Sequence, residues 1–565
     1  MNSFIPPLSD DLLLQHNFFE LYPFDGGGCF INREIIGSIN DADITNRIIE
    51  QNALKDFGAL DDIYFLQFEH WRTIEKSCWI NRMYFIVPIA KQYSVTHEER
   101  LAKIIRQILI RFALTYHAPE SQQEIVDLEA RVLYSRDHDY NSHGPEFDGP
   151  ADYQWFDFQP ASRIIHILYA MYFMKDSPSF SAADHEIIDE LVRIHARNIN
   201  WAETGGNELA PGNHQALRGT ALVYAAYAFR DEPEAAEWLN TAMTICNYHI
   251  LNDFLPDGML IDLSPSYHFF ETWISRDAII LTKRLGREFP KETFERISHA
   301  YDACRLFRQP DGRSTVINDG YPLDLDTFIA TLPPSSSPVL SANILPNAGI
   351  AIWKKDDTFM LFDCSPLLDE FSHFHGGKQA VTLFFDNKPF LSDSNCCSYD
   401  DDDFAQWFKQ PEAHSTLLIN GKGDSVIEGR YHWVAASKTI LEPWAGNTIT
   451  ASMTGAAPEW DNVRWSRTVS MAAKNITITD TASRPVAADM TLIFNLHPDV
   501  KAEVDGKTAI LTNGATVVRA EFDAPVTLVN ATGYQDYRKV PSMQLRVQFS
   551  GITNLSTVSV FRLDK

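Results

Sequence analysis

The sequence has 565 residues, of which 45% are hydrophobic and 12% aromatic, and its formal net charge is -27. This composition excludes a disordered or fibrous chain, and the length suggests two or three domains. The negative charge argues against a broad nucleic-acid-binding surface, which would be basic, but it leaves room for a local cationic pocket that holds an anionic sugar.

The N-terminal residues lack the features of a secretory signal, namely a basic start, an apolar stretch and a small-residue cleavage site. No apolar run approaches the roughly 20 residues that span a bilayer. We therefore expect a cytoplasmic protein, or a periplasmic one if a signal was removed. The cysteines number seven, and Cys396 and Cys397 are adjacent, which fits reduced thiols better than a disulfide scaffold.

The first 345 residues have helical periodicity. Residues 97–117 place five apolar side chains on one helix face: Leu101, Ile104, Ile105, Ile108 and Phe112. A second amphipathic run, over residues 187–194, follows a capping-box pattern from Ser181 to Asp184. Many helices joined by loops rich in glycine, proline, aspartate and asparagine predict an α/α toroid, an incomplete helical barrel, over residues 1–345.

From about Ile350 the period changes to two, as in the run NITITD at residues 475–480. Two dipeptides are typical of hairpin turns, Asp505-Gly506 and Asn513-Gly514. The segment LPPSSSPVLSANIL, residues 332–345, is the natural linker. We expect an antiparallel β-sandwich over residues 346–565, with a subdivision considered near residue 480. The fold class is therefore multidomain α+β.

The first segment that could carry chemistry is PGNHQALRG, residues 211–219. A turn enters a helix here, with Asn213 and His214 near its start. Amide and imidazole groups at a helix N-terminus suit a carboxylate, because free N–H groups and the helix dipole point there. The alternative is that Asn213 merely caps the helix.

The second segment, DGMLIDLSPSYHFF, covers residues 257–270 and contains Tyr267. A tyrosine acts as general base or acid if its pKa falls from about 10, and half-ionisation at pH 7 requires roughly 4 kcal/mol. A neighbouring imidazolium or guanidinium would be needed. The alternative is a core tyrosine that bonds to the backbone.

The third segment contains His373 and His375, which would point to one face if they lie on a strand. The fourth runs from Asp393 to His414, with Tyr399 between them. His375, Asp393 and His414 would form a set that suits zinc with an open fourth position. Taken by itself, His414 is more often a core histidine.

Four runs in this order resemble the heparinase II/III-like polysaccharide lyases, which include heparin, heparan and alginate lyases. They are PGNHQALRG, DGMLIDLSPSYHFF, HFHGGKQAVTLFFDNKPFLSD and EAHSTLLING, and the resemblance spans about residues 150 to 425. It implies a helical toroid joined to an antiparallel β-sandwich. It also implies cleavage of uronic-acid-containing glycans by β-elimination, which gives unsaturated uronate products.

The resemblance also implies catalytic roles. Asn213 corresponds to the family's carboxylate-neutralising amide, and His214 follows it as in several members. Tyr267 looks like the catalytic tyrosine and His373 like the catalytic histidine, and either could be the base. Tyr399 falls near a second active-site tyrosine of some members.

By the same resemblance, His375, Asp393 and His414 would be ligands of a structural zinc ion near the active site. This sequence departs from the family at two positions. The family's His-x-His motif is usually followed two positions on by Asp, where this chain has Gly377, and the last histidine is often followed by Asn, where this chain has Ser415.

Arg163, Arg218 and Lys378 are candidates for binding the substrate anion, and Trp155 for stacking on a sugar ring. The alternative is that these residues have ordinary surface or packing roles. The expected partner is an anionic poly- or oligosaccharide, most simply a glycosaminoglycan such as heparan sulfate, heparin, hyaluronan or chondroitin, with alginate or its oligomers as the alternative. We also consider a homodimer. We expect neither a nucleic-acid partner nor insertion into a membrane.

Two interpretations that assign the protein to other functional classes stay open. Helical toroids also carry glycoside hydrolases, which use paired carboxylates, and Asp257 with Asp262 could supply such a pair. The chain could instead bind or help assemble an anionic polysaccharide without cleaving it.

Overall fold

A computed structural model describes residues 80–83, 86–139, 153–320, 322–323, 325–335, 338–367, 373–394, 407–428, 432–472, 474–535 and 538–564. The chain forms two compact units: unit 1 is Met1–Asp253 with Phe270–Ile297, and unit 2 is Phe254–Phe269 with Ser298–Lys565. The expected division after residue 345 stays a prediction. Within the described ranges, no helix is both long and apolar enough to cross a membrane.

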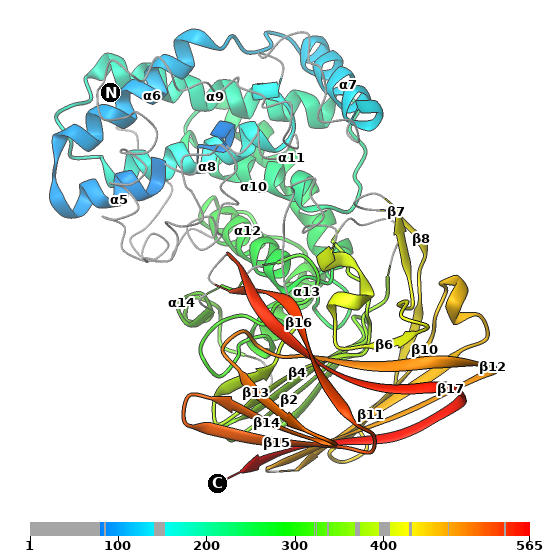
Figure 1. Cartoon of the computed structure of the whole chain (residues 1–565). Helices are drawn as coiled ribbons and strands as arrows, with labels where there is room; N and C mark the ends of the chain where they lie inside the picture. The colour runs from blue at the N-terminus through cyan, green and yellow to red at the C-terminus, as the bar shows by residue number, and fades with distance from the viewer. Residues whose placement is uncertain are drawn as a thin grey trace. The chain divides into compact units, whose positions relative to one another are not determined.

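Unit 1 is helical (Figure 1). Two helices, α12 and α13, run from one unit into the other, and α14 belongs to unit 2. The helices are η3 (Ile80–Arg82), α5 (Ile86–Thr96), α6 (Glu99–Thr115), α7 (Gln122–Asp139), η4 (Tyr153–Trp155), α8 (Phe158–Phe173), α9 (Ala182–Thr204), α10 (Asn213–Ala228), α11 (Pro233–Asn252), α12 (Pro265–Arg284), α13 (Lys291–Leu306) and α14 (Leu325–Ala330).

Both helical runs that the sequence predicts lie in helices of the structure. All five apolar residues expected on one face of α6 are buried. Helix α9 begins with the expected capping box, in which the Ser181 side chain accepts from the Asp184 backbone and the Asp184 side chain accepts from the Ser181 backbone. Helix α8 is buried along almost its whole length, with α5, α9 and α10 packed around it. Apolar burial around α8 therefore organises the helical part.

In its described residues, unit 2 contains two large antiparallel sheets and one two-stranded sheet (Figure 1). The smaller has the order β1-β2-β3-β4-β5, with β1 (Ala342–Leu345), β2 (Ile350–Lys355), β3 (Thr358–Asp363), β4 (Ala380–Phe385) and β5 (Lys388–Leu391). The larger has the order β13-β14-β15-β17-β12-β11-β10-β9, with β16 paired to β17 and β6 to β12. Strands β7 (Val426–Glu428) and β8 (His432–Ala435) form a separate pair.

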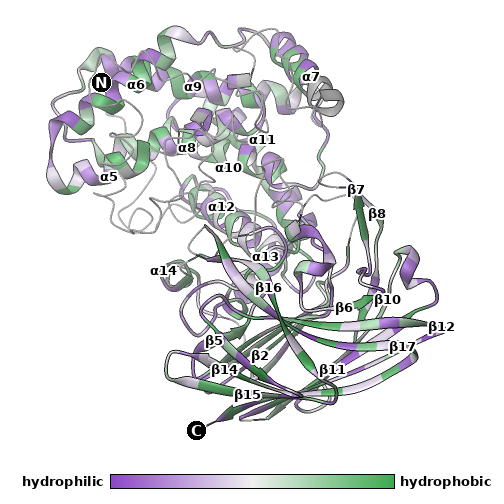
Figure 2. Cartoon of the chain, viewed as in Figure 1, coloured by the Kyte–Doolittle hydropathy of each residue, from purple (hydrophilic) through white to green (hydrophobic). Residues whose placement is uncertain are grey.

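The larger sheet consists of β6 (Leu417–Ile419), β9 (Lys438–Leu441), β10 (Thr448–Thr454), β11 (Arg464–Ala472), β12 (Asn475–Asn495), β13 (Lys501–Asp505), β14 (Thr508–Asn513), β15 (Thr516–Phe522), β16 (Val526–Gln535) and β17 (Arg538–Asp564). Buried and partly exposed residues alternate along β11 and much of β12. Figure 2 shows the same mixture of hydrophobic and hydrophilic positions along the strands.

One hydrophobic cluster joins the two sheets. It contains Met360 and Leu383 from the smaller sheet and Val469 and Leu492 from the larger. The sheets thus share a core as the two layers of a sandwich, which confirms the predicted fold class.

Both predicted hairpins are present: β13 pairs with β14, and β14 with β15. Gly506 and Gly514 have φ angles of 60° and 62°, which glycine adopts without steric cost. One boundary differs from the prediction, because the last four residues of the expected linker, Ala342–Leu345, form β1 by pairing with β2. Cross-strand pairing decides this and is not visible in the local sequence.

Candidate active site and metal-binding group

Tyr267 and His373 are neighbours in unit 2. Helix α12 begins at Pro265, which puts Tyr267 in its first turn. The Tyr267 ring stacks on the His373 imidazole, with centroids 3.9 Å apart and planes inclined by 29°. Both side chains are partly exposed, in contrast to the fully buried His268 beside them. The structure thus brings together two predicted catalytic groups that are 106 positions apart in the sequence, at 267 and 373.

The segment from His373 to Gln379 differs from the expectation. It is irregular and leads into β4 rather than forming a strand. Gly377 has a φ of 69°, which is incompatible with an extended strand. His373 and His375 therefore do not share a strand face, and they converge in another way, on the carboxylate of Asp319.

Asp319 contacts both imidazoles through separate oxygens. Nδ1 of His373 lies 3.1 Å from Oδ2, and Nε2 of His375 lies 2.8 Å from Oδ1. The ammonium of Lys409 donates to Oδ2 at 3.1 Å. Asp319, His375 and Lys409 are all buried. Burial raises the pKa of Asp319, but Lys409 and the two imidazoles lower it by more, so the carboxyl remains ionised.

Sequence reasoning missed Asp319. It lies in the run Asn318-Asp319-Gly320, a composition typical of a solvated turn. No local signal separates it from such a turn. Its burial and its two histidine partners arise only when the chain folds.

Asn318 connects the loop before Tyr267 to the loop that carries His375. Its side-chain Nδ2 donates to the Leu263 carbonyl at 2.8 Å, and its Oδ1 accepts from the His375 backbone at 3.1 Å. Asn318 has a φ of 58°, a conformation that asparagine tolerates better than most residues. The side chain thus holds the start of α12 near the histidine loop.

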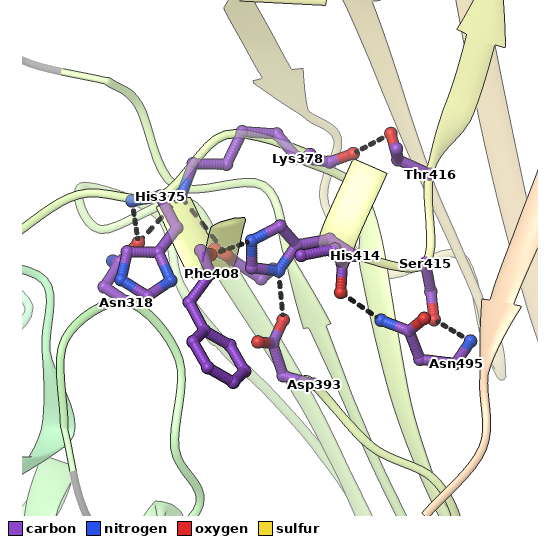
Figure 3. Close-up of polar contacts among 12 residues, drawn as sticks. Asn318, His375, Lys378, Asp393, Phe408, His414, Ser415, Thr416 and Asn495 are labelled. Carbon is purple, nitrogen blue, oxygen red and sulfur yellow. Dashed lines mark hydrogen bonds and ion pairs between the residues drawn. The ribbon is translucent and has the colours of Figure 1, made fainter. Parts of the chain in front are cut away.

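The expected metal ligands also come together in unit 2. Ligand atoms of His375, Asp393 and His414 all lie within 4.8 Å of one another. Nδ1 of His414 is 2.8 Å from Asp393 Oδ2, and Nε2 of His414 is 2.8 Å from the Phe408 carbonyl (Figure 3). Nδ1 of His375 is buried and has no hydrogen-bond partner.

This donor set fits a divalent metal ion. In both histidines Nε2 faces an acceptor, Asp319 for one and the Phe408 carbonyl for the other. This leaves Nδ1 of His375 without a partner and Nδ1 of His414 beside Asp393, so both nitrogens lie with the third donor of the group, and each ring is held through its other nitrogen. Burial lowers the pKa of His375 to about 4, so its imidazole is neutral at pH 7, as a ligand must be. Burial also lowers the pKa of His414, but the Asp393 carboxylate raises it by more, so this imidazole keeps a proton more readily until a cation takes its place. The unpartnered Nδ1 of His375 is the clearest sign of this fit.

Asn213 lies in unit 1, at the first position of α10. The N-cap is Gly212, whose backbone N–H donates to Asp253 Oδ2 at 3.2 Å. The alternative that Asn213 caps the helix is therefore wrong. Within the described part of the chain, its side-chain amide makes no hydrogen bond. The amide is thus available to a ligand.

His214 is the next residue and is paired with Asp157. Its Nδ1 lies 2.5 Å from Asp157 Oδ2, and its ring packs edge-on against Phe158 with centroids 4.9 Å apart. The side chain is 40% exposed. The catalytic roles predicted for Asn213 and His214 remain predictions.

The three basic residues expected to bind substrate are all buried in other contacts. Arg163 donates to His195 and to the carbonyls of Asn81 and Gln154. Its guanidinium also packs over the ring of Trp155, which is itself buried. Arg163 and Trp155 therefore lie in the packed interior of unit 1, and their substrate-binding roles stay predictions.

Arg218 forms ion pairs with Glu129 at 2.9 Å and Glu203 at 2.7 Å. Lys378 donates to Asn318, to Asp363 and to Ser365, at 3.1, 3.3 and 2.9 Å. A buried cation needs such partners, because an unpaired charge in the interior is costly. The three basic side chains thus make interior contacts in the structure, and their role in substrate binding stays a prediction. Tyr399 lies outside the described residues.

A second group of metal-ligating residue types occurs in unit 1: His249, Asp253 and Glu271. Nδ1 of His249 lies 2.6 Å from Asp253 Oδ2, and Nε2 of His249 lies 3.2 Å from Gln215 Oε1. Because Asp253 also accepts from Gly212, these contacts account for how α10 starts.

Two family models together match most of the chain: the heparinase II/III N-terminus over residues 36–334 and the heparinase II/III-like C-terminal region over residues 338–560. A heparin-sulfate lyase of Pedobacter heparinus is 22% identical over 306 residues, which cover 49% of this chain and 45% of that protein. Another, from Bacteroides thetaiotaomicron, is 22% identical over 450 residues, which cover 68% of this chain and 61% of that protein. The matched segments thus span only about half of these relatives.

A solved structure of heparinase III has a TM-score of 0.69 at 15% identity and covers 98% of this chain and 88% of its own. A mutant heparan sulfate lyase from Pedobacter heparinus has a TM-score of 0.62 at 16% identity and covers 94% and 89%. These similarities show the fold, and the family models, which match more than half of the sequence, show that the chain belongs to the heparinase II/III family.

Proposed function

We propose that this protein is a polysaccharide lyase that cleaves a uronate-containing glycosaminoglycan of the heparan sulfate type by β-elimination. The names of the relatives suggest the substrate. The single observation that carries the reaction type is the Tyr267 ring stacked on His373, whose Nδ1 faces Asp319. This arrangement supplies two adjacent proton-transfer groups, one of them oriented by a carboxylate.

The reaction removes the C5 proton of a uronate. That proton is weakly acidic while the neighbouring carboxylate carries its full charge, so a donor to the carboxylate must stabilise the enolate-like intermediate. We assign this role to the amide of Asn213, which is unengaged in the described part of the chain. A donor of this kind contributes about 3–4 kcal/mol.

Tyr267 and His373 would divide the proton transfers. One takes the C5 proton, the C4–C5 double bond forms as the C4–O bond breaks, and Tyr267 gives a proton to the leaving glycosidic oxygen. General acid–base catalysis of this kind contributes about 10²–10⁴-fold. Which group is the base depends on whether the substrate is a gluco- or an iduronate.

We further propose that His375, Asp393 and His414 hold one zinc ion. Two imidazoles and one carboxylate are a common zinc donor set. A bound zinc ion would supply structural bracing, because β-elimination needs no metal-activated water. His375 would thereby be fixed two positions from His373.

Asp257, one of the two carboxylates considered for a hydrolase, has structural contacts instead. The carboxylate of Asp257 accepts from the backbone N–H groups of Met259, Asn347 and Ala348, at 3.3, 2.7 and 3.0 Å. A carboxylate whose two oxygens accept from three backbone N–H groups holds the turn together, so its oxygens are already engaged.

The test is a panel of heparan sulfate, heparin, hyaluronan, chondroitin sulfates, dermatan sulfate and alginate, followed by the near-ultraviolet absorbance of the unsaturated uronate. We expect turnover of heparan sulfate, and loss of at least about 10²-fold in kcat in Tyr267→Phe. Tyr248→Phe is the matched control, because it removes a phenol hydroxyl that makes no hydrogen bond in the described residues. Reducing ends without the double bond would indicate a hydrolase, and binding without cleavage a non-catalytic protein.

A further inference from the structure

We propose that Asp319 is a shared positioning residue that fixes the ring of His373 for catalysis and the ring of His375 for metal binding. The inference rests on the proposed lyase function and adds a residue to it. It also predicts that the catalytic histidine and the metal site are coupled through one carboxylate.

Among the described residues, Asp319 is the side chain that contacts both imidazole rings. Oδ2 faces His373 Nδ1 at 3.1 Å, and Oδ1 faces His375 Nε2 at 2.8 Å. An ionised carboxylate can only accept hydrogen bonds. Both of these ring nitrogens must therefore carry a hydrogen, and Lys409 compensates the carboxylate charge from 3.1 Å.

The two histidines are consequently held in opposite tautomers. His373 carries its hydrogen on Nδ1, which leaves Nε2 as the nitrogen able to take a proton from substrate. His375 carries its hydrogen on Nε2, which leaves the lone pair of Nδ1, the buried atom without a partner, for the metal. One carboxylate thus prepares a base on one side and a metal ligand on the other.

Asp319 is itself rigidly held. Its backbone N–H donates to the His373 carbonyl at 2.9 Å, and its carbonyl accepts from the Ser264 hydroxyl at 2.5 Å. Ser264 directly precedes α12, the helix that carries Tyr267. The next residue, Gly320, packs so closely that an added Cβ would lie 2.6 Å from Ser266 Oγ. The carboxylate is therefore placed relative to Tyr267 as well as to both histidines.

A positioning role predicts a defined kinetic signature. Asp319→Asn is nearly isosteric but has a single acceptor oxygen, so it cannot accept from both rings. We expect kcat to fall by about 10–100-fold with KM changed by less than about threefold, and zinc affinity to fall by about tenfold or more. The loss in kcat should persist when added zinc restores full occupancy, measured by elemental analysis.

The matched control is Asp424→Asn. Asp424 is also a buried carboxylate of unit 2. It accepts from the Gly377 backbone at 3.2 Å and from the Ser425 hydroxyl at 2.6 Å, and among the described residues it contacts neither imidazole. The kcat of Asp424→Asn, measured per folded protein, should stay close to that of the wild type. Equal losses in kcat for both variants would mean that removing any buried carboxylate in this region has the same effect, and would overturn the specific role of Asp319.

A second measurement uses the wild-type protein and does not depend on the variant folding. In protein labelled with ¹⁵N-histidine, long-range proton–nitrogen spectra report which ring nitrogen is protonated. We expect His373 as the Nδ1–H form and His375 as the Nε2–H form, assigned by the signals lost in His373→Gln and His375→Gln. The opposite tautomer at either residue contradicts the proposal.

The outcomes separate this inference from the proposed function. If the wild type cleaves none of the glycans, the lyase proposal fails, while tautomers and zinc affinity still test Asp319. If the wild type is active and Asp319→Asn regains full kcat at full zinc occupancy, Asp319 acts through the metal alone and shared positioning is refuted.

Discussion

Substituting Gly377 tests how tightly the loop that carries the proposed metal ligand His375 is packed. Gly377 occupies the position where the family that the sequence resembles usually has aspartate. Its φ is +69°, and an added Cβ would lie 2.5 Å from the Cβ of His414 and 2.9 Å from its Cγ. His414 cannot simply move away, because its two ring nitrogens contact Asp393 and the Phe408 carbonyl. Gly377→Ala should therefore displace His414, one of the proposed metal ligands.

The expected cost has two parts. A non-glycine residue in the left-handed region costs about 1–2 kcal/mol. Overpacking against a fixed neighbour costs a further 1–3 kcal/mol or so. Gly506→Ala is the control for the first part, because Gly506 has a φ of +60° and an added Cβ would have no neighbour within 4 Å. Unit 2 of Gly377→Ala should thus lose about 2–5 kcal/mol, and that of Gly506→Ala only about 1–2 kcal/mol.

Calorimetric unfolding and zinc content should be measured on both variants. Gly377→Ala should unfold at a lower temperature than Gly506→Ala and should bind zinc at least about tenfold more weakly. If the two variants unfold alike and bind zinc alike, the Cβ does not strike His414, and the packing argument is wrong.

Three further predictions concern the site and its surroundings. Asn213→Ala should lower kcat by about 10²–10³-fold, and a change in KM alone would contradict carboxylate neutralisation. Purified protein never exposed to chelator should contain about one zinc ion per chain, as expected of such a donor set, and His414→Ala should contain much less. Burial, with a smaller effect of Arg308, lowers the pKa of Lys354 to about 7, so this lysine disfavours folding most below that pH and less as pH rises toward its ordinary pKa. The unfolding temperature of the wild type should therefore rise more from pH 7 to pH 9 than that of Lys354→Met, and equal rises would refute the burial effect.

The sequence by itself determined the elements and the family. Helical periodicity predicted the buried face of α6, and the capping box predicted the start of α9. Both hairpin turns were predicted from their glycine dipeptides. These signals are local, since each depends on residues a few positions apart. The order of the short motifs likewise predicted the family, which the family models confirm.

Only the tertiary structure decided what each charged side chain does. Arg163, Arg218 and Lys378 are the same residue types that bind sugar anions, but burial commits them to interior partners. Asp319 looked like part of a turn, and it acquires two imidazoles and an ammonium as partners only in the fold. The physical reason is that hydrogen bonding and ion pairing of buried groups depend on residues distant in sequence, whose convergence local patterns do not encode.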